Sequence, residues 1–200
     1  MTVGRRSDAP RKGDLREQAL LDAAEELLEH TSLENLTVEA IAQRAGISRG
    51  SLYFYFGNKH EVLAALVERT MRTIRAHADA TARDESSSPL KAMERAVHAT
   101  EQVWRAHSTV MRAAVDYSAL HPVIGAAWSE TVERFARTMT QVLRSAGIPE
   151  EDGPGGASAL AYALCWMTER TFYRAACSGE GDLERASATI VEIWRRVMTG

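Results

Sequence analysis

The sequence predicts an all-α protein of about nine helices, the first three of them in a small N-terminal domain. Two observations carry this prediction. Apolar residues recur at steps of three and four positions along nearly the whole chain, whereas almost no segment alternates between apolar and polar residues. Stretches rich in glycine, proline and serine interrupt the helical spacing and so divide the chain into separate helices.

The composition is typical of a soluble globular protein, with 45% hydrophobic and 26% charged residues. No apolar run approaches the ~18–20 residues that a membrane span needs, and the polar N-terminus lacks the apolar core of a secretory signal. The two cysteines, Cys165 and Cys177, are too few for a disulfide framework and fit no metal-binding spacing. We therefore expect a cytoplasmic protein with no membrane partner, no metal and no cofactor.

Residues 1–13 are expected to form a flexible basic arm ahead of the first domain. Residues 1–16 hold five basic and two acidic side chains, although the whole chain has a net charge of −3. A basic tail of this kind often binds DNA, and a solvated, disordered tail explains the charge equally well.

A helix-turn-helix domain is predicted over residues 14–60. Its first helix begins with Asp14 as the N-cap and carries an apolar stripe on one face. The second helix begins at Thr37 and ends at Gly46, because glycine accepts the left-handed conformation of a helix C-terminus. The third helix is capped by Ser48 and extends to about Phe54.

A larger domain is predicted over residues 61–200. A long helix from Lys59 to about Thr81 leads into it and opens with Asn58–Glu61, a sequence that resembles a capping box. The polar segment Arg83–Pro89 follows as a linker. The remaining helices are expected at residues 90–106, 108–118, 122–146, 157–178 and 182–198.

The most informative pattern is TVEAIAQRAGISRGSLYFYFGNK, residues 37–59. Two short helices joined by the tight turn Ala45–Ile47 indicate a helix-turn-helix, whose second helix fits the major groove of double-stranded DNA. The apolar residues at positions that such a unit buries are Val38, Ile41, Ala42, Ile47 and Leu52.

The start of the third helix is expected to meet base edges. Arg49 can donate two hydrogen bonds to guanine, Gly50 allows a close approach to a thymine methyl group, and Ser51 can bind a base or a phosphate. The residues expected to support DNA binding, mainly at the phosphates, are Thr37, Arg44, Ser48, Tyr53, Tyr55 and Lys59. Because four adjacent aromatic residues cannot all face inward, we expect Phe54 and Phe56 in the core and both tyrosines outside.

The segment TVEAIAQRAGISRGSLYFYFGNKHEVL resembles the signature of the TetR family of bacterial repressors. Three later segments, WSETVERF, WMTERTFYRAACSGE and IVEIW, resemble the ethionamide-resistance repressor (EthR) branch of that family. The resemblance implies a homodimer on operator DNA, a ligand-binding C-terminal domain, and a dimer surface on the last two helices. Cys165 and Thr168 stand where polar amides are expected to line the pocket of that branch.

The C-terminal domain gathers four tryptophans and several methionines, which fits an apolar cavity lined by aromatic side chains. For each of these residues, an ordinary place in the hydrophobic core is the competing interpretation. The residues expected to contact a ligand are Met93, Val97, Thr100, Trp104, Met111, Trp128, Phe135, Met139, Trp166, Thr168, Phe172, Tyr173 and Trp194. Glu169 could add a polar contact, although an ion pair with Arg170 or a dimer contact is the favoured interpretation.

The sequence therefore predicts a DNA-binding transcriptional regulator, a repressor released from a palindromic operator by a small apolar ligand. An enzyme is the main alternative, but the chain has no glycine-rich phosphate loop, no nucleophile elbow and no HExxH or paired-cysteine motif. A purely structural helical adaptor would not explain the outward-facing residues Arg49–Ser51.

Overall fold

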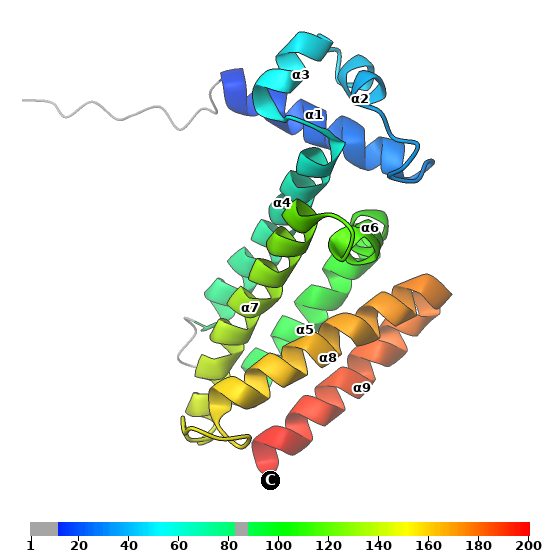
Figure 1. The fold of residues 1–200 in the computed structure, drawn as a ribbon. Coiled ribbons are helices and arrows are strands. Elements are labelled where there is room, and N and C mark those ends of the chain that lie inside the picture. Colours follow the sequence, from blue (N-terminus) through cyan, green and yellow to red (C-terminus); the bar gives the residue numbers. More distant parts are fainter. Residues whose placement is uncertain (1–11, 83–87) are drawn as a thin grey trace, which may run out of the picture. The chain divides into compact units, whose positions relative to one another are not determined.

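The computed structural model describes residues 12–82 and 88–200, and these residues form the helices α1 to α9 with no strand among them (Figure 1). The predicted fold class is confirmed. Most of the predicted basic arm and linker lies outside the described residues. The chain divides into two compact units, Met1–Val62 and Leu63–Gly200, which we call the N-terminal unit and the C-terminal unit. No described helix is long and apolar enough to cross a membrane.

The N-terminal unit contains α1 (Lys12–Leu28), α2 (Val38–Arg44) and α3 (Arg49–Tyr55). The helix α2 packs against both α1 and α3. The side chains of Leu20, Ala24, Ile41, Leu52 and Phe56 are among those buried in its core. These residues recur at helical spacing, so hydrophobic burial fixes which face of each short helix turns inward.

Local hydrogen bonds set the ends of these helices where the sequence predicts them. The Thr37 hydroxyl accepts from the backbone N–H of Ala40 at 3.1 Å, and the Ser48 hydroxyl accepts from that of Ser51 at 3.2 Å. Gly46, in the turn between α2 and α3, has φ = 65°, a conformation that glycine adopts without strain. The prediction for Asp14 is wrong, because α1 begins at Lys12 and Asp14 lies in its first turn, where its charge still suits the helix dipole.

The helix α4 (Lys59–Ala82) begins with a capping arrangement close to the predicted one. The Asn58 side-chain oxygen accepts from the backbone N–H groups of His60 and Glu61, at 2.9 and 3.1 Å. The Glu61 carboxylate reaches back to the N–H of Gly57 at 2.8 Å. Three otherwise unpaired backbone donors are thereby satisfied at this helix start.

The C-terminal unit contains α5 (Pro89–Ala106), α6 (Ser108–Ser118), α7 (Pro122–Ser145), α8 (Ala157–Ser178) and α9 (Glu180–Thr199), together with α4 from Leu63 onward. The most extensive packing joins α7 to α8, α5 to α9, and α8 to α9, which lie side by side in Figure 1. Its fully buried side chains include Met93, Trp104, Phe172 and Ile190. The five predicted helix ranges agree with the observed ones to within two residues.

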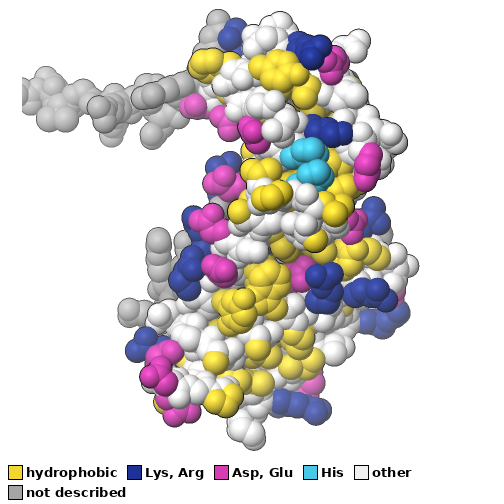
Figure 2. Space-filling view, viewed as in Figure 1, with side chains coloured by type: hydrophobic (Ala, Val, Ile, Leu, Met, Phe, Trp, Pro, Cys, Tyr) yellow, Lys and Arg dark blue, Asp and Glu magenta, His cyan; other side chains and the backbone are white. Residues whose placement is uncertain are grey.

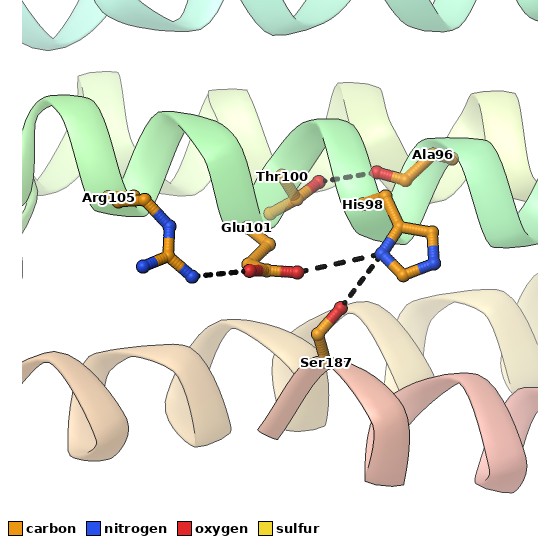
Figure 3. Close-up of polar contacts among 6 residues, drawn as sticks. All are labelled: Ala96, His98, Thr100, Glu101, Arg105 and Ser187. Carbon is orange, nitrogen blue, oxygen red and sulfur yellow. Dashed lines mark hydrogen bonds and ion pairs between the residues drawn. The ribbon is translucent and has the colours of Figure 1, made fainter. Parts of the chain in front are cut away.

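A polar cluster joins α5 to α9 (Figure 3). The buried Glu101 carboxylate accepts from Arg105 Nη2 at 2.7 Å and lies 3.5 Å from His98 Nδ1. The same histidine nitrogen lies 3.3 Å from the hydroxyl of Ser187 on α9. Burial alone would raise the pKa of Glu101, but the bonds from Arg105, Ser187 and His98 outweigh it and lower this pKa.

Candidate DNA-binding surface and ligand cavity

The outer surface of α3 carries a cation and an exposed aromatic side chain. Leu52 and Phe56, four residues apart, face the core. Phe54 lies between them in sequence and is 84% exposed. The prediction that Phe54 is a core residue is therefore wrong, because a residue two positions from a buried one points to the opposite side of a helix. Figure 2 shows hydrophobic side chains exposed over the α3 segment.

Arg49, at the first position of α3, is exposed but already engaged. Its Nη1 lies 2.5 Å from a Glu39 carboxylate oxygen, and its Nη2 donates to the Tyr53 hydroxyl at 3.2 Å. The guanidinium carbon also lies 5.5 Å from the centre of the Tyr53 ring. The Arg49 side chain remains 60% exposed, so it can exchange these partners for a ligand from solvent.

The small residues near the start of α3 leave this surface open. A Cβ atom added to Gly50 would meet no atom within 4 Å, so the fold does not require glycine there. The hydroxyls of Ser48 and Ser51 lie 2.9 Å apart, and Ser48 already serves as the N-cap. Tyr55 is half-buried, whereas Tyr53 is exposed.

Two cations expected at the phosphates have partners inside the N-terminal unit. The Lys59 ammonium donates to the backbone carbonyls of Glu34 at 2.6 Å and Leu36 at 3.1 Å. Arg44 Nε donates to a Glu26 carboxylate oxygen at 2.7 Å and so ties α2 to α1. These structural roles were not foreseen, and phosphate binding by Lys59 or Arg44 stays a prediction.

The C-terminal unit contains a mainly apolar cavity with about 580 Å³ of empty space, which includes space open to solvent. Its lining is mostly hydrophobic and aromatic, as is usual for small-molecule sites. The predicted ligand residues that line it are Val97, Thr100, Trp104, Met111, Trp128, Phe135, Met139, Thr168 and Trp194. The rings of Trp104 and Trp128 meet edge to face, with centroids 6.2 Å apart.

Four of the predicted ligand residues do not line this cavity. Met93 and Phe172 are fully buried in the core, which is the competing interpretation stated above. Trp166 is half-buried on α8. Tyr173 donates its hydroxyl to Asp116, and this bond is the main reason that the pKa of Tyr173 is raised to about 12.

Six lining residues were absent from the predicted set: Met71, Ala96, Thr131, Val132, Cys165 and Glu169. Burial raises the pKa of the Cys165 thiol to about 12, so this residue lines the cavity as a neutral thiol. The resemblance had pointed to the position of Cys165, and Glu169 had been weighed as a polar contact. Nothing in the sequence pattern distinguished the other four from ordinary core residues.

Glu169 was expected either to contact a ligand or to pair with Arg170, and its position is compatible with both. It lines the cavity, and its carboxylate oxygen Oε2 lies 3.6 Å from Arg170 Nε, beyond hydrogen-bond distance. Burial raises the pKa of Glu169, while Arg170 and Trp128 act in the opposite direction. Trp128 interacts closely enough to lower this pKa, but neither Glu169 carboxylate oxygen has a hydrogen-bond partner of normal geometry among the described residues.

Comparison with known proteins agrees with both halves of this description. Residues 20–66 match the family described as bacterial regulatory proteins, tetR family, and residues 93–200 match the C-terminal domain of the transcriptional regulator EthR. The chain is 30% identical to the transcriptional regulator EthR of Mycobacterium tuberculosis over 96% of its own length and 90% of that protein. It is 29% identical to EthR of Mycolicibacterium smegmatis over 98% and 92% of the two chains.

Solved structures share the fold at lower identity. The regulatory protein TetR of Rhodobacter sphaeroides aligns with a TM-score of 0.69 at 24% identity, covering 89% of this chain and 98% of that one. A TetR transcriptional regulator of Legionella pneumophila aligns with a TM-score of 0.70 at 17% identity, covering 94% and 99%. The chain belongs to the TetR family of bacterial regulatory proteins, with a C-terminal domain of the EthR type, and is a DNA-binding transcriptional regulator, not an enzyme.

Proposed function

We propose that this regulator is a homodimeric repressor that binds a palindromic operator through α3 and is released when a small, largely apolar molecule enters the cavity of the C-terminal unit. The observation that carries the proposal is this cavity, walled by Trp104, Trp128 and Trp194, in the unit that follows the DNA-binding helices. The tetracycline repressor of class C from Escherichia coli, 39% identical over 71 residues, is a repressor by name and supports this direction of control.

On operator DNA, Arg49 exchanges Glu39 and Tyr53 for the edge of a guanine, the base that offers arginine two acceptors. Phe54 and Gly50 lie one helical turn apart on the exposed face of α3. An apolar side chain beside a residue without one suits contact with thymine methyl groups. Thr37 and Ser48 keep their capping roles and contribute through the helix ends that they fix.

The dimer forms through α8 and α9. The exposed face of α8 carries Ala159, Tyr162 and Ala163, with the half-buried Trp166 one turn further on, and Tyr162 is 51% exposed. Figure 2 shows hydrophobic side chains gathered along this helix. A two-fold axis would place both α3 helices about 34–36 Å apart, one turn of DNA.

Coupling between ligand and DNA runs through α4. This helix begins at Lys59, whose ammonium is bound to carbonyls before α2, and further along it Met71 lines the cavity. A ligand that displaces Met71 therefore acts on the helix that also anchors the DNA-binding unit. A ligand shifts DNA affinity only if it binds the two conformations unequally.

The test is a gel-shift experiment with the full-length protein and DNA fragments from its own gene neighbourhood. We expect a retarded complex on one fragment, protection of a palindrome in footprinting, and release by at least one hydrophobic compound that binds the cavity. Retardation that is equal on every fragment would refute operator recognition. Tight cavity binders that leave the operator complex intact would refute release by ligand.

A further inference from the structure

We propose that the cavity selects a ligand that carries a positively charged amine on an apolar body, and that the Glu169 carboxylate binds this amine. The inference rests on the proposed function, because it specifies the chemical class of the effector. It depends on one feature that distinguishes Glu169 from every other residue lining the cavity.

Glu169 is only 6% exposed, and neither of its carboxylate oxygens has a hydrogen-bond partner among the described residues. Buried polar groups are nearly always hydrogen-bonded, because an unpaired group loses its contacts with water and gains nothing in return. A carboxylate left without hydrogen bonds in a mainly apolar cavity is therefore complementary to a ligand that brings the donors.

The hydroxyl groups of the threonines that line the cavity already have hydrogen-bond partners. Thr100 and Thr131 donate to the backbone carbonyls of Ala96 and Ala127, at 2.8 and 2.9 Å. The Trp194 indole N–H donates to the Thr168 hydroxyl at 3.1 Å. Each of these hydroxyls therefore has at least one hydrogen-bond partner, whereas the buried Glu169 carboxylate has none.

Arg170 does not remove this need. Its Nε stays 3.6 Å from Glu169 Oε2, its side chain is mostly exposed, and its guanidinium lies 5.1 Å from the Tyr173 ring centre. An exposed cation that also lies against an aromatic ring compensates a buried carboxylate incompletely. The positive charge that would compensate Glu169 therefore has to come from a ligand in the cavity.

The aromatic walls favour the same ligand class. Trp104, Trp128 and Trp194 line the cavity together with Phe135. Tryptophan faces attract cations, and the attraction grows when the cation is removed from water. An ammonium group thus finds both a carboxylate and π-electron surfaces here, whereas a carboxylate ligand would be repelled by Glu169. A neutral ligand could donate a hydrogen bond to Glu169 but would leave its charge uncompensated.

The test compares three compounds that share one apolar body: 4-phenylbutylamine, 4-phenylbutan-1-ol and 4-phenylbutanoate. Isothermal titration calorimetry with the full-length protein measures their dissociation constants at pH 7. We expect the amine to bind about tenfold more tightly than the alcohol, and the carboxylate to bind most weakly. Equal affinities for amine and alcohol, or no binding of the amine, would overturn the proposal.

Two variants make the result specific. Glu169→Gln keeps the shape of the side chain and removes its charge, so the preference for the amine should vanish while the alcohol binds as before. Glu133→Gln removes the same charge from an exposed position on α7 and should leave the preference intact. If both variants keep the preference, Glu169 is not the amine site.

Failure of this inference and failure of the proposed function can be told apart. A gel-shift measurement with the amine present gives the second readout. Tight, Glu169-dependent binding that leaves the operator complex intact would refute release by ligand and support the amine site. Release by the alcohol at the same concentration as by the amine would support the repressor mechanism and overturn the amine site.

Discussion

The contact between Arg49 and Glu39 makes a sharp prediction about DNA affinity. In the free protein the carboxylate of Glu39 holds the guanidinium that is proposed to bind guanine, at 2.5 Å. Operator binding has to break this ion pair. Glu39→Gln removes the competing charge and should therefore increase affinity for the operator, because Arg49 no longer has to break an ion pair before it binds DNA.

The size of the expected gain in affinity follows from the solvent exposure of Arg49 and Glu39. Both side chains are more than half exposed, and ion pairs at such positions contribute little. The gain on the operator should not exceed about fivefold. Arg49→Ala, by contrast, should cost about tenfold to a hundredfold in discrimination between operator and random DNA, since a two-bond contact with guanine is lost.

The assay is fluorescence anisotropy with labelled operator and with a scrambled duplex, at one fixed salt concentration, because affinity for DNA depends steeply on salt. Removing any acidic residue weakens repulsion from DNA, so Glu29→Gln, an exposed carboxylate between α1 and α2, is the matched control. The gain from Glu39→Gln should be larger than that from Glu29→Gln and should disappear in the Arg49→Ala background. An equal gain on scrambled DNA, or a gain that survives Arg49→Ala, would refute the reasoning.

Four further predictions test other parts of the structure. Phe54→Ala should lower operator affinity without lowering the melting temperature, since the ring is exposed; a loss of stability in circular dichroism would contradict this. The lowered pKa of Glu101 stabilises the wild-type protein above the unfolded-state pKa of a glutamate, and this stability is lost as pH falls through the folded-state pKa. Glu101→Gln should remove this contribution, so the urea midpoints of the two proteins should differ at neutral pH and converge in acid. Glu169→Gln should act in the opposite sense: its folded-state pKa is raised, the wild-type protein loses stability as pH rises from the unfolded-state pKa through the folded one, and the variant should be the more stable at neutral pH. Gly125→Ala should cost about 1–3 kcal/mol in unfolding free energy, because its Cβ would lie 2.5 Å from a backbone carbonyl oxygen of α6, whereas Gly50→Ala, with open space around it, should cost nothing.

The helices could be predicted because their signals are local. Thr37, Gly46 and Ser48 mark helix ends through bonds within three residues of themselves, or through a backbone conformation that glycine favours. Phe54 was misplaced because hydrophobicity was weighed above helical geometry. With Leu52 inward, the residue two positions later has to point outward, so the sequence did contain the correct answer.

The partners of charged residues could not be predicted, because they depend on tertiary contacts. The Lys59 ammonium binds carbonyls more than twenty residues earlier in the chain, and no pattern around Lys59 indicates this. The cavity shows the same limit. Large residues such as Trp104 and Phe135 stand out in a sequence, whereas Ala96 and Met71 resemble any core residue until the helices are in place.

The four tryptophans fall into two groups, and the fluorescence of each group would report on a different event. Trp104, Trp128 and Trp194 line the cavity, so their emission responds to whatever enters it. Trp166 lies outside the cavity on α8, and its emission responds instead to a change of solvent exposure along that helix. A Trp166→Phe variant would therefore report cavity occupancy alone, and a variant that keeps only Trp166 would report the subunit association that we propose for α8, each without any attached dye.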